Sequence, residues 1–184
     1  MTFTNLSIPR RRMLAAGLGA AALALPKAAL ARTILQRGMS GGGLAQLEGS
    51  EEPRLANFGL FASAVQLPEG QNLVLGSIQW IEAGTNLQLQ SLEVTQCIPI
   101  PNRTDGAEVR GRMQVNGQGD YPFVARAMDG GTPGSALDRV ELEVNSGGAL
   151  EGDAAPGSDD EFTYNAAGNL VAGDVQWIIA DIVI

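Results

Sequence analysis

The chain has 184 residues, with 20 acidic and 12 basic side chains, one cysteine and no histidine. The absence of histidine excludes Ser-His-Asp and Cys-His catalysis and zinc sites built on imidazole. All 20 acidic residues follow Ala31 and four of the 12 basic residues precede it, so residues 32–184 have a net charge of 8 − 20 = −12. Such a protein lacks the basic surface that neutralises phosphates, and we expect no nucleic-acid partner.

Residues 1–31 have the layout of an export signal peptide. Three arginines, Arg10 to Arg12, precede an apolar run over residues 13–25, and Ala29-Leu30-Ala31 has the A-x-A form of a cleavage site. The run is shorter than the roughly 20 residues of a membrane span. The arginines followed by Met13-Leu14 are similar to a twin-arginine signal, with the general secretory route as the alternative. We expect the twin-arginine translocon as a transient partner, a periplasmic or extracellular location, and no stable membrane insertion after cleavage.

The next segment, residues 32–49, contains Gly41-Gly42-Gly43 and is expected to be a flexible linker. Residues 50–184 form the expected single β domain. Its first strands are predicted over residues 55–66, 73–81 and 87–98, where apolar residues recur with the period of a strand. In the third of these the alternation changes phase between Ser91 and Leu92, which predicts a β-bulge.

The clearest β pattern runs over residues 108–145. This pattern predicts three antiparallel strands, with turns at Asn116-Gly117 and at residues 129–134. A short strand over residues 162–165 and a last strand over 174–184 follow a glycine-rich acidic loop. Helical periodicity is absent after the signal peptide. The sequence therefore predicts an all-β fold, an antiparallel β-sandwich or up-and-down β-barrel of roughly seven to nine strands.

Both tryptophans lie in a ten-residue segment that occurs twice in similar form. Residues 72–81 and 169–178 are identical at seven of ten positions, which include Trp80 and Trp177. One interpretation is that the two rings fill the core of the domain. The other is that they border a pocket, where rigid aromatic surfaces would bind a sugar or an apolar ligand.

Acidic side chains cluster in two glycine-rich loops, which suggests calcium as a possible cofactor. Asp129 and Asp138 flank one loop, and Asp153, Asp159 and Asp160 lie in the other. Carboxylate oxygens are the hard ligands that Ca²⁺ requires, although such loops are often only solvated. Cys97 lies in an apolar run and is expected to pack in the core.

The central strands also carry a family resemblance. Residues 115–123 (VNGQGDYPF), 129–134 (DGGTPG) and Asp138-Arg139-Val140 are similar to the motifs of the post-COAP domain family of exported bacterial proteins. The resemblance implies an exported β module and supplies no catalytic residue. We expect a non-catalytic module with a structural or binding role and a cell-surface or other protein partner. A small-molecule-binding barrel and a carboxylate-based hydrolase are the alternatives.

Overall fold

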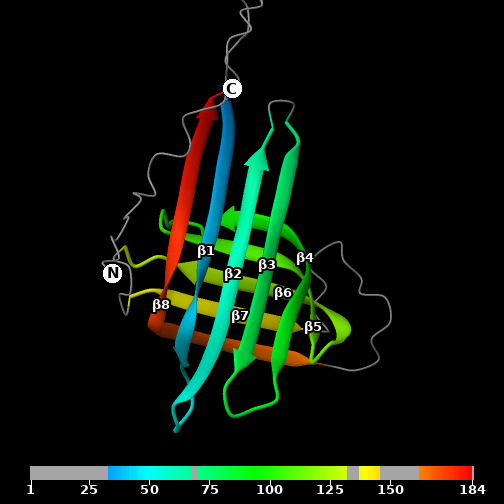
Figure 1. The fold of residues 1–184 in the computed structure, drawn as a ribbon, viewed down its shortest axis with the longest axis vertical. Helices are drawn as coiled ribbons and strands as arrows, with labels where there is room; N and C mark the ends of the chain where they lie inside the picture. Colours follow the sequence, from blue (N-terminus) through cyan, green and yellow to red (C-terminus); the bar gives the residue numbers. More distant parts are fainter. Residues whose placement is uncertain (1–32, 68–69, 132–136, 146–161, 184) are drawn as a thin grey trace, which may run out of the picture. The chain divides into compact units, whose positions relative to one another are not determined.

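The computed structural model describes residues 33–67, 70–131, 137–145 and 162–183. Within these ranges the chain forms eight antiparallel strands that close into an up-and-down barrel (Figure 1). The strands are β1 (Thr33–Leu47), β2 (Arg54–Gln66), β3 (Asn72–Glu82), β4 (Gln88–Pro99), β5 (Gly106–Val115), β6 (Gln118–Met128), β7 (Arg139–Asn145) and β8 (Thr163–Val183). The predicted all-β fold is confirmed, and the barrel is the architecture adopted.

The barrel is flattened into two layers. Strands β8, β1, β2 and β3 lie side by side in a front layer, and β5, β6 and β7 cross behind them (Figure 1). β4 and β8 bend from one layer to the other. β4 does so at two register shifts against β5, one of them between Ser91 and Glu93, which confirms the predicted bulge. The two strands predicted near the C-terminus are parts of one long strand, β8, with Gly173 at a positive φ of 104°.

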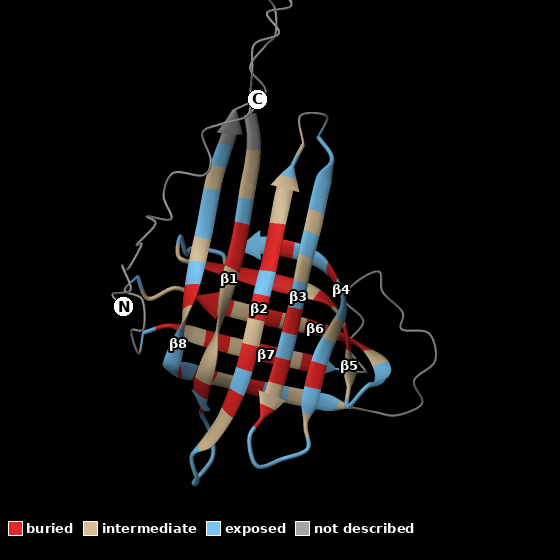
Figure 2. Ribbon diagram, in the orientation of Figure 1, coloured by how far each residue is buried: buried red, intermediate tan, exposed pale blue. Residues whose placement is uncertain are grey.

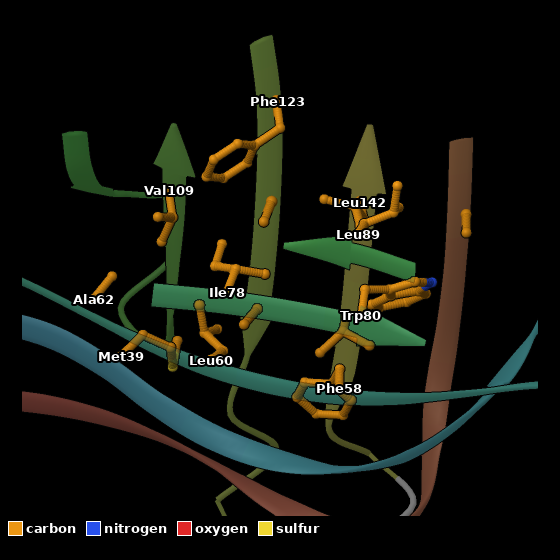
Figure 3. Close-up of a cluster of buried hydrophobic side chains, with 14 of the residues drawn as sticks. Met39, Phe58, Leu60, Ala62, Ile78, Trp80, Leu89, Val109, Phe123 and Leu142 are labelled. Atoms are coloured by element: carbon orange, nitrogen blue, oxygen red, sulfur yellow. The ribbon is translucent and has the colours of Figure 1, made fainter. Parts of the chain in front are cut away.

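Side chains fill the interior between the layers. Buried residues occur along the strands of both layers (Figure 2). Met39, Trp80, Leu89, Phe123 and Leu142 are each at most 1% exposed, and they belong to one hydrophobic cluster (Figure 3). The inward residues of the predicted three-stranded unit, among them Val140 and Leu142, pack into the same cluster. That unit is therefore a scaffold for the core.

The predicted flexible linker over residues 32–49 is wrong, because residues 33–47 form β1 in the middle of the front layer. Its glycines have a packing role. A Cβ atom on Gly41 would lie 2.6 Å from the carbonyl oxygen of Asp174, and one on Gly43 would overlap the carbonyl oxygen of Ala172. Glycine at these positions therefore lets the β1 backbone approach β8 closely. From composition alone, the same run of glycines predicts a flexible segment.

The front layer extends past the back layer at one end (Figure 1). β3 pairs with β4 only through residues 79–81, and β8 pairs with β7 only through residues 163–169. Beyond those positions the four strands pair only with one another. We call this part, residues 35–38, 62–66, 72–77 and 176–181, the projecting sheet. On its inward side the projecting sheet faces residues 95–99 of β4, and it forms one wall of a cleft there.

Candidate ligand-binding cleft

The cleft lies where the projecting sheet faces the C-terminal half of β4. It has a volume of about 390 Å³ and is lined by Leu35 and Arg37 of β1, Ala64 and Gln66 of β2, Asn72 and Val74 of β3, and residues 95–99 of β4. The two bulges of β4 place these last residues opposite the projecting sheet. The cleft therefore depends on the combination of a long front layer and a bent β4.

The lining combines apolar surface with a single positive charge. Leu35, Val74 and Ile98 provide aliphatic surface, and the side chain of Arg37 is exposed beside them. The six other arginines of the described ranges all form ion pairs with carboxylates: Arg54, Arg103, Arg110, Arg112, Arg126 and Arg139. Arg37 forms none with any described residue. A guanidinium without a carboxylate, in a partly apolar cleft, suits a ligand that carries an anionic group.

Cys97 also lines the cleft, but it is not a nucleophile there. The residue is 5% exposed, and burial raises the pKa of its thiol to about 11, although a hydrogen bond to the backbone of Ala64 opposes the shift. At neutral pH the thiol is therefore protonated, and thiolate is the reactive form. The prediction that Cys97 packs in the core is confirmed.

Neither tryptophan borders the cleft. Trp80 is 1% exposed in the core, where its indole N–H donates a 2.9 Å hydrogen bond to the hydroxyl of Tyr164. The space next to Trp80 has a volume of only about 20 Å³, too small for a ligand. Trp177 is half-buried, and its backbone lies opposite Met39 of β1. The backbone of Trp80 lies opposite Phe58 of β2, so the two tryptophans do not share a register position. The structure therefore supports the core-filling interpretation for Trp80 and places both rings outside the lining.

Asp129 and Asp138 bind backbone amides. The Asp138 carboxylate accepts hydrogen bonds from the N–H groups of Gly130 (2.8 Å) and Val175 (3.0 Å), and Asp129 accepts from Gly131 (2.7 Å) and Trp177 (3.0 Å). Val175 and Trp177 lie beyond the part of β8 that pairs with β7. The two carboxylates therefore replace a neighbouring strand along this edge of β8, a role that the acidic loop pattern did not reveal.

The structure does not assemble the predicted calcium ligands. Asp153, Asp159 and Asp160 lie outside the described residues. Within the described ranges, no three or more histidine, cysteine, aspartate or glutamate side chains gather where they could hold a metal ion. Calcium binding thus stays a prediction for the second loop, and Asp129 and Asp138 have the structural role given above.

A buried polar network at the other end of the interior was missed by the sequence interpretation. The carboxylate of Glu82, 3% exposed, accepts two hydrogen bonds of 2.7 Å from Arg54 and one of 2.9 Å from Tyr164. Burial, reinforced by Glu82, raises the pKa of the Tyr164 hydroxyl well above its usual value. The inward alternation Ile78, Trp80, Glu82 is the signal that could have located this carboxylate. Because three donors satisfy Glu82, it serves as a structural acceptor.

Comparison with family models, with curated proteins and with solved structures found no match. The resemblance to the post-COAP family therefore stays a prediction. Among the described residues, none belongs to a helix with the length and apolar character needed to cross a membrane.

Proposed function

We propose that the protein is an exported, non-catalytic binding module that holds a small organic anion in the cleft at the projecting end of its barrel. The observation that carries this proposal is Arg37, the one described arginine without an ion pair, placed inside a cleft of about 390 Å³. Clefts of roughly 300–1,000 Å³ accommodate small molecules.

The lining indicates the chemistry of the ligand. Arg37 would bind a carboxylate or a similar anionic group, and Leu35, Val74 and Ile98 would contact an apolar body. The side-chain amides of Gln66 and Gln96 offer additional hydrogen bonds. The net charge of −12 opposes the approach of any anion, but salt screens charges beyond about 8 Å at physiological ionic strength. At contact distance Arg37 therefore has the larger effect.

Three features support a non-catalytic role. Histidine is absent from the chain, and the thiol of Cys97 is protonated at neutral pH. The buried carboxylates of the described residues, Glu82, Glu108 and Asp138, all accept hydrogen bonds from arginine, tyrosine or backbone N–H groups. These three carboxylates therefore serve as structural hydrogen-bond acceptors, although carboxylates can in general provide acid–base catalysis.

The ligand proposal is tested by calorimetric titration with decanoate and with decanol as its neutral counterpart. We expect decanoate to bind more tightly than decanol and the Arg37→Gln variant to bind decanoate about tenfold or more weakly, because a charge-assisted hydrogen bond contributes about 1.5–3 kcal/mol. Binding of decanol should not change. Arg103→Gln is the matched control, because Arg103 is exposed and paired with Asp105 outside the cleft lining.

A second variant separates the cleft from nonspecific adsorption of the probe. Ala64→Leu places a larger side chain in the cleft and should weaken the binding of both probes. Equal decanoate affinity in the native protein, Arg37→Gln and Ala64→Leu would show that the probe binds elsewhere. No binding of decanoate, benzoate or other organic acids by the native protein would refute the proposed function.

Export is a separate part of the proposal and rests on the N-terminal sequence. Changing Arg10 and Arg11 together to lysine should keep the protein in the cytoplasm, because the twin-arginine translocon recognises the paired arginines. Cell fractionation followed by immunoblotting measures the outcome. Undiminished export of the double variant would indicate the general secretory route.

A further inference from the structure

Four large apolar side chains with exposed fractions of 40% or more lie on the outward side of the front layer. Phe61 and Leu73 are each 47% exposed, Leu75 is 53% exposed and Ile178 is 40% exposed. We call these four residues the outward patch. Register places Leu75 beside Ser63, Ser63 beside Gly38, and Gly38 beside Ile178, so that small residues lie between the larger ones. An apolar group of this kind on a sheet face is typical of an interaction surface.

On the solvent side the outward patch lies among uncharged residues, with Asp174 of β8, which pairs with Gly42, at the border of this region. Across residues 36–42, 55–65, 73–81 and 176–180 of the four strands, the only charged residue is Arg37, and its side chain lies in the cleft on the inward side. The chain after Ala31 otherwise has a net charge of −12. Two copies of so acidic a protein repel one another over most of their surface. The outward patch carries no charge itself, so it is where two copies could meet with the least repulsion.

The shape of the face is self-complementary. Phe61 stands two residues from Gly59 on the same side of β2, because side chains two positions apart share a sheet face. Gly59 lies in a hollow of about 150 Å³ that is also lined by Asn57, Gln79 and Ile81. A Cβ atom added to Gly59 would have no other atom within 4 Å, so the hollow is open. A projecting ring and a hollow therefore lie side by side.

We infer that the outward patch binds a second copy of this chain, with the Phe61 ring of each copy in the Gly59 hollow of the other. In such a twofold arrangement the same surface serves both partners, and each ring–hollow contact occurs twice. The exposed leucines and Ile178 enlarge the apolar contact around this pair. The interface uses the opposite side of the front layer from the ligand cleft, so it does not depend on the proposed ligand.

The test is the molar mass of the purified protein, measured by light scattering after size-exclusion chromatography at micromolar concentration. The native protein should have a multiple of the monomer mass. Phe61→Asp should weaken self-association at least tenfold, because the charge would be buried without a partner. Gly59→Trp should also separate the copies by filling the hollow. Leu92→Asp is the matched control: Leu92 is 54% exposed on β4, outside the outward patch, and its variant should keep the native mass.

Circular dichroism of each variant establishes that the barrel is still folded when its mass is compared. A monomeric native protein would overturn the inference, and so would a folded Phe61→Asp variant of native mass. Flotation with vesicles of phosphatidylcholine and phosphatidylglycerol tests a lipid surface as the other occupant. If a monomeric native protein floats with the vesicles and Phe61→Asp does not, the patch binds lipid and the inference is wrong.

Discussion

Asp138 joins three segments of the fold through one residue. Its carboxylate accepts hydrogen bonds from the N–H groups of Gly130, in the loop after β6, and of Val175 in β8. Its backbone carbonyl oxygen accepts a hydrogen bond from the N–H of Leu170. The residue is 1% exposed, and its bond to Val175 is buried from solvent, whereas Gly130 is half-buried. Buried backbone groups without partners are costly, which makes Asp138 a structural residue.

Replacing Asp138 with alanine should lower the free energy of unfolding by about 2–3 kcal/mol, because the buried N–H of Val175 and the half-buried N–H of Gly130 would lose their acceptor. Asp138→Asn retains one side-chain oxygen and should lose less. Urea denaturation followed by tryptophan fluorescence measures both changes. Asp181→Ala is the control, because Asp181 is exposed near the end of β8. A loss below about 1 kcal/mol in Asp138→Ala would contradict the structural role.

Strands β5, β6 and β7 share an outer face held by alternating charges. Glu108 of β5 accepts hydrogen bonds from Arg110 and Arg126, and Arg126 also pairs with Glu143 of β7. Burial by itself raises the pKa of Glu108, but the hydrogen bonds and charges of Arg110 and Arg126 outweigh it, and the pKa lies below its usual value. Ion pairs exposed on a surface stabilise little; this carboxylate is 9% exposed and is screened less.

The lowered pKa of Glu108 predicts the pH dependence of stability. Its stabilising contribution is complete above the unfolded-state pKa of about 4.3 and is lost as the pH falls through the lower folded-state pKa. Glu108→Gln should therefore lower the free energy of unfolding by about 2 kcal/mol at pH 7 and by less at acidic pH. Urea denaturation at a series of pH values measures this difference. Glu93→Gln is the control and should leave the pH profile unchanged, because Glu93 is an exposed carboxylate of β4 without an ion pair to any described residue. An equal loss of stability for Glu108→Gln at all pH values would contradict the proposed role of Glu108.

At the scale of the barrel, the unequal extent of its two layers positions both candidate surfaces. The projecting sheet forms one wall of the cleft on its inward side, and with the adjoining front layer it carries the outward patch on the other. A barrel with layers of equal length would bury the inward side beside the core. The same strands can therefore serve a ligand and a second copy of the chain at once.

The sequence alone determined the features that depend on neighbouring residues. The period-two alternation located β2 to β7 and the bulge of β4, and the inward positions of residues 108–145 proved to be core. The tertiary structure decided the rest: the glycines of β1 allow close contact with β8, Asp129 and Asp138 bind the edge of β8, and Arg37 lies in a cleft without a carboxylate. These roles depend on partners from distant parts of the chain. A local pattern records which side of a strand is apolar, but not which distant backbone will lie against it.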